Sequence, residues 1–371
     1  MFLTNFLRGD IMIAFDTSGR QYHLQETNLG GGEGTLCMIE EAPHLCAKVF
    51  KAGKRTRGKE AKILGWGQLL SAGKIDTRFC DQVVVPRDCL YSQSDNQDFN
   101  SLLGYTMEKL TGFRTLQNIY EKNDIDFIQR VWIARNLCIL TNRVHSLGSG
   151  FVVGDYNTNN VAVFLATSTA KFIDVDSFQL VVSRNGKKVF CPCNAAVPEF
   201  VAPEVSRRLR KERTNLENIT QGPDNPVFTQ YTDRYALAYH IFALLINGSA
   251  PFAAMVNMEE LAKHPSKNVS SVDLSRFRAA DKGDFVFAKK SLLKKPPEYA
   301  PSYDILSPTL KDLFERAFIA GAKDPTLRPD PSEFYSALSK YLNSLEMRPC
   351  GHVLPSFYTG SCEWCRISRL S

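Results

Sequence analysis

The sequence predicts an α+β protein in which a small β-rich unit precedes a larger helical unit and a short metal-binding tail. Three observations support this division. Residues 1–112 contain short apolar runs separated by glycine, proline and asparagine, a pattern typical of β-strands. Residues 113–346 contain segments with apolar residues at helical spacing. Residues 347–371 concentrate cysteine and histidine in a stretch too short to build its own core.

The predicted elements follow from these patterns in order along the chain. The predicted strands span residues 11–15, 36–39, 45–50 and 83–85. One predicted helix, residues 57–70, interrupts them. The later predicted helices span residues 127–140, 231–247, 307–320 and 331–345. We expect the boundary between the two units near Gly112, and a loop over the polar segment 209–226.

Composition narrows the class of protein. The chain has 371 residues, with 44% hydrophobic and 23% charged residues and a net charge of +6, all ordinary for a globular protein. The N-terminus lacks the basic leader and apolar core of a signal peptide, and the apolar stretch 235–246 is too short to cross a bilayer. We therefore expect a cytoplasmic protein with no membrane partner. The basic run 48–62, beside a glycine-rich segment, could hold nucleotide phosphates or nucleic acid, but we favour a solvated helix face and predict no specific nucleic-acid partner.

A glycine-rich segment separates two predicted strands. Its glycines are Gly30, Gly31, Gly32 and Gly34. Glycines let backbone amides approach phosphate groups closely, although such a hairpin is also an ordinary turn. Fourteen residues after Gly34, Lys48 lies in an apolar strand, where it is either a snorkelling edge residue or a phosphate ligand. Glu60 is the only acid between Lys48 and Lys74, so a phosphate-binding Lys48 is expected to pair with Glu60.

Three polar residues form the second candidate cluster. Asp155 and Asn160 lie five residues apart in a polar turn, and Asp174 follows on the far side of a short hairpin. Carboxylate and amide oxygens can hold Mg²⁺ and orient a hydroxyl nucleophile. The spacing of Asp155 and Asn160 alone is also consistent with a polar turn capped by its own side chains.

Taken in order, these residues resemble those of a protein kinase, specifically the bacterial serine/threonine kinases with a eukaryotic-like fold, over roughly residues 20–345. Asp155 matches the catalytic aspartate, Asn160 the metal-binding asparagine and Asp174 the aspartate of the Asp-Phe-Gly motif. Further matches are the hinge at 107–110, the helix end at His145, the activation-segment end at 202–204, the helix residue Asp233, and Arg328, which would pair with Glu204.

The resemblance implies a bilobal protein-kinase-like fold with an N-lobe at 1–112 and a C-lobe at 113–346. It also implies transfer of the γ-phosphate of ATP to serine or threonine hydroxyls of proteins, including the kinase itself. Asn160 and Asp174 would hold Mg²⁺, and Asp155 would orient the attacking hydroxyl. Lys48, held by Glu60, would fix the α- and β-phosphates. The backbone of Glu108 and Leu110 would bond to adenine.

The chain departs from the kinase pattern at three positions, and these leave alternatives open. Gly154 replaces the arginine that receives an activating phosphate, so we expect no activation of that kind. Asn157 replaces an auxiliary lysine, and Asp176 stands where Asp-Phe-Gly has glycine. The first alternative is therefore a pseudokinase or nucleotide-dependent binding module that docks a signalling partner. A small-molecule kinase is a further alternative, although residues 202–204 and Asp233 count against it.

The run 174–178 resembles a pattern from one group of bacterial kinase-like proteins. Some members of that group are encoded near a metal-dependent phosphatase and a von Willebrand A-type protein. The resemblance therefore implies those two proteins as partners, besides protein substrates.

The C-terminal tail contains four possible metal ligands, namely Cys350, His352, Cys362 and Cys365. Sulfur and imidazole ligands suit tetrahedral zinc, so we expect a structural, zinc-ribbon-like Zn²⁺ site. A redox-active Cys-x-x-Cys pair is the alternative, but no βαβ context accompanies it. Cys191 and Cys193 could be zinc ligands or redox sensors, but we expect them to be ordinary thiols in a loop.

Overall fold

The computed structural model describes residues 11–370 except 96, 123, 185–186, 265–267, 272–273, 289–290 and 292. The N-terminal residues that argue against a signal peptide lie outside this range. The chain forms two compact units. Unit 1 comprises residues 1–112 and 171–192, and unit 2 comprises residues 113–170 and 193–371. The first division falls at Gly112, whereas the sequence pattern did not indicate that 171–192 belongs with the N-terminal part.

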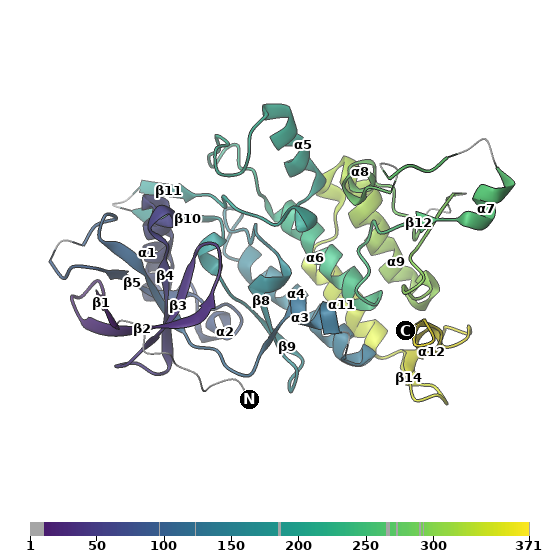
Figure 1. The fold of residues 1–371 in the computed structure, drawn as a ribbon, viewed down its shortest axis with the longest axis horizontal. Helices are drawn as coiled ribbons and strands as arrows, with labels where there is room; N and C mark the ends of the chain where they lie inside the picture. The colour runs from purple at the N-terminus through teal and green to yellow at the C-terminus, as the bar shows by residue number, and fades with distance from the viewer. Residues whose placement is uncertain are drawn as a thin grey trace. The chain divides into compact units, whose positions relative to one another are not determined.

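Unit 1 is built on a closed β-barrel with the strand order β1-β2-β3-β4-β6-β5. Its strands are β1 (Ile11–Phe15), β2 (Gln21–Gly30), β3 (Gly34–Ile39), β4 (Leu45–Phe50), β5 (Pro86–Tyr91) and β6 (Leu102–Glu108). Inward-facing residues form its core, among them Ala14, Leu24 and Ala47, which are fully buried. Figure 1 shows these strands gathered around one centre. Buried residues alternate with more exposed ones over the first half of β2, as a barrel wall requires.

The predicted strands at 11–15, 36–39 and 45–50 are confirmed by β1, β3 and β4. The predicted strand at 83–85 is wrong. Val83 makes only an isolated bridge to Phe172, and β5 begins at Pro86. All three valines of 83–85 are nonetheless buried, so their apolar run reflects burial on all sides rather than pairing within the barrel.

Helix α1 (Arg57–Ser71) begins where Thr56 accepts a hydrogen bond from the backbone of Lys59, which confirms the predicted helix. It packs against β5 and against the hairpin of β10 (Leu180–Arg184) and β11 (Lys187–Cys191). A short helix, α2 (Thr77–Cys80), follows α1. The hairpin belongs to the returning segment of unit 1, which also contains the 3₁₀ turn η3 (Val175–Ser177).

Unit 2 is mainly helical. Its helices are α3 (Leu116–Lys122), α4 (Phe127–His145), α5 (Pro203–Glu212), α6 (Gln230–Leu245), α7 (Met258–Lys263), α8 (Arg276–Lys282), α9 (Pro308–Glu315), α10 (Gly321–Lys323), α11 (Pro331–Leu342) and α12 (Glu363–Ile367). Its antiparallel strand pairs are β7 (Arg114–Thr115) with β8 (Val161–Phe164), β12 (Met255–Val256) with β13 (Lys294–Lys295), and β14 (Leu345–Met347) with β15 (Val353–Pro355). Strand β9 (Thr169–Phe172) crosses the sequence boundary between the units.

Helix α6 forms the centre of unit 2 and is buried along almost its whole length. The ring of Phe242 lies 5.2 Å from that of Phe314 and 5.4 Å from that of Phe285. Its continuous apolar sequence therefore marks a helix buried on all sides rather than an amphipathic one. Among the residues that the structure describes, no helix is both long and apolar enough to traverse a bilayer.

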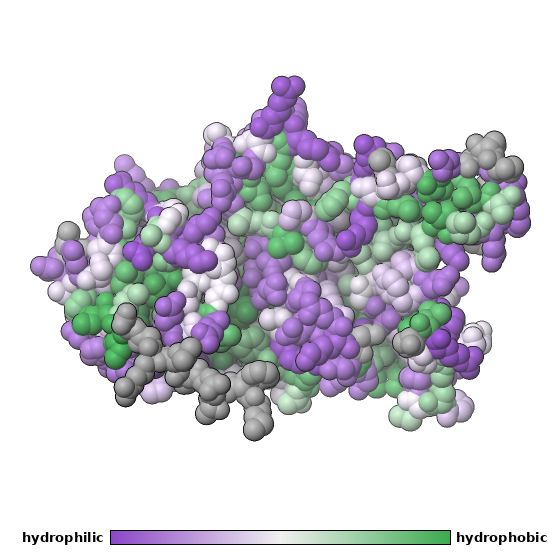
Figure 2. All heavy atoms as spheres, viewed as in Figure 1, coloured by the Kyte–Doolittle hydropathy of each residue, from purple (hydrophilic) through white to green (hydrophobic). Residues whose placement is uncertain are grey.

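The helices predicted at 127–140, 231–247 and 331–345 are confirmed by α4, α6 and α11, with small differences at their ends. The helix predicted at 307–320 is interrupted, because α9 passes into a π-helical turn at Arg316–Ala320. The expected loop at 209–226 starts after residue 212 instead of at 209, because α5 continues to Glu212. Only Pro203 and Val205 of α5 are buried, and its hydrophilic side chains gather at the top of the view in Figure 2.

Candidate functional site

Lys48 is the buried cation of unit 1. It lies on β4 with a relative exposure of 6%, and its ammonium group pairs with the carboxylates of Asp174 and Asp176. Nζ of Lys48 lies 2.8 Å from Oδ1 of Asp176. Tyr105, which stands opposite Lys48 on β6, donates a hydrogen bond of 2.9 Å to the same oxygen. A lysine inside an apolar strand is thereby neutralised within the protein.

The charges of this cluster depend on one another. Burial would disfavour the ammonium of Lys48, but the two aspartates outweigh it and raise the pKa of Lys48 above its ordinary value. Burial also opposes ionisation of Asp176, yet Lys48 and Tyr105 hold the pKa of Asp176 below its ordinary value. Burial and the carboxylate of Asp176 raise the pKa of Asp174 to about 6, against the pull of Lys48. Asp176 is thus the main counter-ion, and Asp174 is the carboxylate that gains most from an added cation.

The expected ion pair between Lys48 and Glu60 is wrong for this structure. Within the described part of the chain, the carboxylates that pair with Lys48 are those of Asp174 and Asp176. Glu60, on α1, instead accepts a hydrogen bond of 3.2 Å from the hydroxyl of Tyr91. The physical reason is that η3 presents a second carboxylate, Asp176, to the ammonium group. The sequence signal that could have found it was the acid at the glycine position of the Asp-Phe-Gly motif.

The turn that carries both aspartates has an unusual backbone. Asp174 has φ 62° and ψ 39°, in the left-handed region that non-glycine residues rarely adopt. The backbone amide and the hydroxyl of Ser177 both donate to the carbonyl oxygen of Asp174, at 3.2 and 2.9 Å. On the other side, Nζ of Lys62 lies 3.1 Å from the carbonyl oxygen of Asp176. These bonds hold the turn in the shape that directs both carboxylates to Lys48.

The glycine-rich segment forms the hairpin between β2 and β3. Gly30 ends β2 and Gly34 begins β3, and the amide of Gly31 donates to the carbonyl oxygen of Gly34 at 2.9 Å. A Cβ atom at Gly34 would lie 2.4 Å from the carbonyl oxygen of Val49, so glycine is required there. At Gly31 or Gly32, by contrast, a Cβ atom would meet no other described atom within 4 Å. The backbone at the hairpin tip is therefore open to a ligand.

The expected hinge follows β6. Glu108 is the last residue of β6 and stands opposite Leu45 on β4. Its carboxylate lies 3.1 Å from Nζ of Lys171. Leu110 is partly buried and lies just after the strand. The side chain of Glu108 is thus engaged within unit 1. Its carbonyl oxygen lies 3.8 Å from Sγ of Cys46, and the amide of Lys109 donates to the carbonyl oxygen of His44.

In unit 2, Asp155 and Asn160 contact each other directly. The amide nitrogen of Asn160 donates to the backbone carbonyl of Asp155 at 2.9 Å and to its Oδ2 at 3.3 Å. The other carboxylate oxygen of Asp155 accepts a bond of 3.2 Å from the backbone of Val197. Its nitrogen is engaged in this way, and within the described residues its side-chain carbonyl oxygen can still accept other ligands. Asn157 caps the intervening 3₁₀ turn η2 (Thr158–Asn160) by accepting from the amide of Asn159.

Asp233 fixes the backbone of this loop from α6. Its two carboxylate oxygens accept hydrogen bonds from the amides of Val153 and Gly154, at 2.8 and 2.9 Å. His145, at the end of α4, adds a third bond of 2.9 Å to Asp233. A carboxylate that accepts three such bonds in a buried position orients the loop firmly. These three bonds join the backbone before Asp155 and the end of α4 to α6.

Gly154 is required by its own conformation. Its φ of +71° suits glycine, and a Cβ atom there would lie 2.7 Å from Sγ of Cys193. Cys193 is fully buried in a cluster with Val152 and Phe228. Cys191, at the end of β11 in unit 1, is also buried. Neither cysteine is joined in a disulfide, as expected.

Arg328 and Glu204 form the expected ion pair. Both terminal nitrogens of Arg328 lie 2.7 Å from the two carboxylate oxygens of Glu204. The same nitrogens also donate to the carbonyl oxygens of Tyr231 and Gly321. The side chain of Arg328 is wholly buried. This bidentate ion pair therefore connects the start of α5 with the segment that precedes α11.

His240 was not identified from the sequence. It is fully buried in α6, and its Nε2 lies 2.8 Å from the carbonyl oxygen of Tyr156, directly after Asp155. Because a carbonyl only accepts, Nε2 carries the hydrogen, and Nδ1 faces the hydroxyl of Tyr120 at 3.2 Å. Burial lowers the pKa of His240 to about 4. A neutral imidazole on α6 therefore holds the backbone directly after Asp155. The sequence did not indicate this contact, because His240 lies in an apolar run.

The four expected metal ligands of the tail come together. Their ligand atoms lie within 4.8 Å of one another and could hold a metal ion such as zinc. The sulfurs of Cys350, Cys362 and Cys365 lie 3.6, 3.6 and 3.3 Å from Nδ1 of His352. Tetrahedral zinc, with bonds of about 2.3 Å to sulfur and about 2.0 Å to nitrogen, would place these atoms about 3.5 Å apart. The observed spacing therefore fits this geometry.

Hydrogen bonding with His352 lowers the pKa of Cys350 to about 6. A hydrogen bond between Cys365 and Cys350 raises the pKa of Cys365 to about 11. A first thiolate is thus available near neutral pH for a metal cation.

The tail is attached to the rest of unit 2 by polar and aromatic contacts. The indole of Trp364 donates to the carbonyl of Val353 at 3.0 Å, and its ring lies 5.0 Å from that of Phe127 on α4. The carboxylate of Glu363 accepts from the backbone of Ser302 at 3.1 Å, and Arg366 bonds two carbonyls in the same region. The segment that carries the four metal ligands is therefore packed against the rest of unit 2.

No protein-family model matches this chain, and no curated protein matches it.

Proposed function

We propose that this chain is an ATP- and Mg²⁺-dependent serine/threonine protein kinase with a bilobal protein-kinase-like fold. The observation that carries the proposal is the ion pair between Lys48 and Asp174, two residues 126 positions apart in the sequence. The sequence pattern assigned them independently to the phosphate end and the metal end of one nucleotide. Their contact in unit 1 is what a single nucleotide site would need.

The geometry of unit 2 supports the same proposal. A kinase must hold the loop that carries its catalytic aspartate, since phosphoryl transfer depends on positioning. Asp233 binds the two backbone amides before Asp155, and His240 supports the residue after it. The pair of Arg328 and Glu204 fixes the end of the segment that would receive the protein substrate.

The residues would share the reaction as follows. Lys48 would hold the α- and β-phosphates once the nucleotide offers it an anionic partner. Asp174 and the carbonyl oxygen of Asn160 would hold Mg²⁺, which neutralises charge on the transferring phosphate. Asp155 would accept the hydrogen bond of a serine or threonine hydroxyl and align its attack. The open backbone around Gly31 would cover the phosphates.

One observation favours a second candidate function, a pseudokinase or nucleotide-dependent binding module. Lys48 already has a full counter-ion in Asp176, besides Asp174. A nucleotide would have to compete with this pair, which would lower the affinity or the rate. Asn157, engaged as a cap, supplies no cation to the transferring phosphate.

Incubation of the purified chain with radiolabelled ATP and Mg²⁺, followed by phosphosite mapping, tests the proposal. We expect autophosphorylation on serine or threonine, lost in Asp155→Ala and retained in Asp224→Asn, which changes an exposed aspartate elsewhere in unit 2. Absence of transfer by the wild type with Mg²⁺ or Mn²⁺ contradicts the enzymatic proposal. A thermal shift with ATP and Mg²⁺ but no transfer supports the binding module instead.

The metal of the tail is proposed to be structural Zn²⁺, because four closed ligands leave no open position for a substrate. The metal-dependent phosphatase and the von Willebrand A-type protein stay predicted partners, and the cytoplasmic location stays a prediction.

A further inference from the structure

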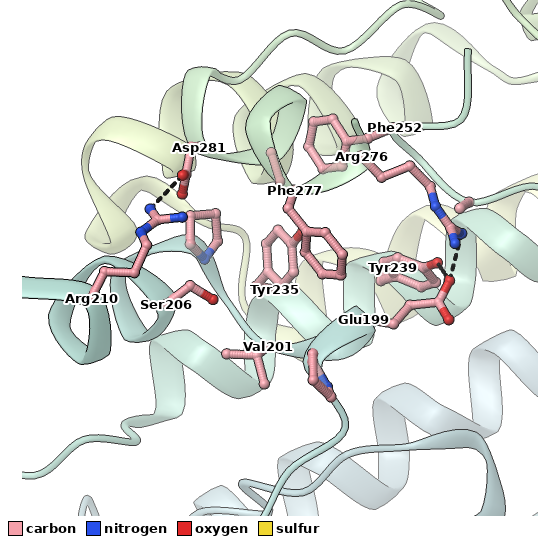
Figure 3. Close-up of a pocket in the computed structure, with 14 residues that line it drawn as sticks. Glu199, Val201, Ser206, Arg210, Tyr235, Tyr239, Phe252, Arg276, Phe277 and Asp281 are labelled. Carbon is pink, nitrogen blue, oxygen red and sulfur yellow. Dashed lines mark hydrogen bonds and ion pairs between the residues drawn. The ribbon is translucent and has the colours of Figure 1, made fainter. Parts of the chain in front are cut away.

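Unit 2 contains a pocket that none of the proposed catalytic residues line. It is formed by α5, α6, α8 and the segment from Pro198 to Pro203, and it encloses about 140 Å³. Figure 3 shows its apolar lining, with Val201, Tyr235, Phe252 and Phe277 contributed by different elements. Phe277 is 54% exposed although it is a large aromatic residue. An exposed aromatic at the mouth of an apolar pocket is typical of a binding surface.

An arginine lies on each side of this pocket. Arg210 contacts Asp281 at 2.5 Å, and Arg276 contacts Glu199 at 2.7 Å (Figure 3). The hydroxyl of Tyr239 also donates to Glu199, at 2.6 Å. The two arginine side chains are 58% and 52% exposed. Within the described chain, each guanidinium makes one side-chain hydrogen bond out of the five that its N–H groups can donate.

The two helices beside the pocket carry an excess of positive charge. The basic residues of α5 and α8 are Arg207, Arg208, Arg210, Lys211, Arg276, Arg278 and Lys282. Their acidic residues are Glu204, Glu212 and Asp281, and Glu204 is already paired with buried Arg328. The pocket is therefore apolar inside, and Arg210 and Arg276 beside it each use one side-chain hydrogen bond. The neighbouring Arg207 and Arg208 are already bonded to backbone carbonyls.

We propose that this pocket binds an acidic peptide segment of a partner protein. One apolar side chain of the peptide occupies the cavity beside Phe277, and Asp or Glu residues on both sides of it engage Arg210 and Arg276. The apolar anchor supplies the desolvated centre that binding needs, and the arginine forks supply carboxylate recognition. Opposite charge on the partner raises the rate of encounter. The proposal does not depend on phosphoryl transfer, because it concerns recognition at a separate pocket.

Fluorescence anisotropy tests this proposal with a probe of defined chemistry. The probe is a short fluorescein-labelled peptide of glutamates with one central leucine, titrated with the full chain. We expect saturable binding that weakens by about tenfold or more in the double variant Arg210→Gln/Arg276→Gln, and by a similar factor in Phe277→Ser. All three side chains are exposed, so these variants should fold, which thermal melting checks.

Matched controls separate the pocket from general charge. Arg278→Gln removes one positive charge from an exposed position of α8 that does not line the pocket, and it is matched to the single variant Arg276→Gln. We expect Arg278→Gln to change affinity less than about threefold, and less than Arg276→Gln does. Peptides with glutamine for glutamate, or serine for leucine, should bind at least about tenfold more weakly.

Four results overturn the proposal. They are no saturable binding, equal binding of the glutamine or serine peptides, an equal loss in Arg278→Gln, and a dimer in sedimentation that Phe277→Ser abolishes. The last result would identify a second copy of the chain as the occupant. Peptide binding by a chain that transfers no phosphate would refute the proposed enzyme activity and leave the pocket assignment intact.

Discussion

Nζ of Lys48 lies 2.8 Å from Oδ1 of Asp176, the residue two positions beyond Asp174, which we propose as a Mg²⁺ ligand. Both side chains are almost wholly buried. A buried charge without a partner is strongly destabilising, so neither residue could keep its charge alone. The counter-ion of Lys48 therefore comes from the turn after β9 and not from helix α1.

Asp176→Asn should destabilise the protein more than Glu60→Gln. The first change leaves Lys48 with only Asp174 as an ionic partner, and we expect it to cost about 2 kcal/mol of unfolding free energy. The second keeps an oxygen that accepts the hydrogen bond from Tyr91, and should cost less than about 1 kcal/mol. Urea denaturation of the two variants beside wild type measures both costs. An equal or larger cost for Glu60→Gln would restore the glutamate as the principal partner.

Arg328→Lys should cost about 3 kcal/mol, because lysine cannot form the bidentate contact with Glu204 and would leave buried carbonyl oxygens unpaired. Arg316→Lys is its matched control. Arg316 forms a similar two-bond contact with Glu333, but both side chains are partly exposed, at 38% and 37%. That variant should lose less than about 1 kcal/mol. Chemical denaturation of each variant decides the comparison, and similar losses would mean that burial does not strengthen the Arg328 contact.

The stability of the protein should fall in mild acid because of His240. The pKa of His240 is about 4 in the folded protein, below the ordinary histidine value of 6.5 that applies to the unfolded chain. Between these values the unfolded chain binds a proton that the folded chain does not. This contribution is thus complete above the unfolded pKa and declines by about 1.4 kcal/mol per pH unit as the pH falls toward the folded pKa.

His240→Gln offers the test of that pH dependence. Glutamine keeps a donor for the carbonyl of Tyr156 but cannot titrate. We expect the variant to have lower stability near neutral pH and a flatter loss on acidification than wild type, measured by urea unfolding across the acid range. Identical slopes would show that His240 makes no contribution.

Zinc removal should release the tail without unfolding the helical core. We expect about one zinc per chain by elemental analysis, lost in Cys362→Ser and retained in Cys80→Ser, which changes a partly exposed cysteine outside the cluster. Hydrogen exchange over residues 345–370 should accelerate in the first variant, while α6 stays protected. A full complement of zinc in Cys362→Ser would exclude the cluster as the site.

Much of the fold could be predicted because its signals are local. The strands β1, β3 and β4, the helices α1, α4, α6 and α11, and the four tail ligands are all visible as periodicity or spacing. The pairing of Arg328 with Glu204 came from the family resemblance and not from a local pattern. The strand predicted at 83–85 was wrong, because a buried segment without strand pairing has the same apolar pattern as a buried strand.

The rest depends on distant parts of the chain. No local pattern shows that Asp176 returns to the barrel wall, that His240 supports the carbonyl of Tyr156, or that α5, α6 and α8 leave a pocket between them. Each of these contacts joins residues tens of positions apart. The candidate pairing of Lys48 with Glu60 failed for this reason, because the only acid between Lys48 and Lys74 is not the acid that contacts Lys48 in space.

The contact between Gly154 and Cys193 limits how this protein could be re-engineered. A designer who wished to place the loop before Asp155 under the control of a phosphate group would begin by introducing arginine at position 154. The positive φ and the nearby sulfur leave no room for that side chain. Residues around Cys193 would have to be rebuilt at the same time, so such control cannot be acquired here through one substitution.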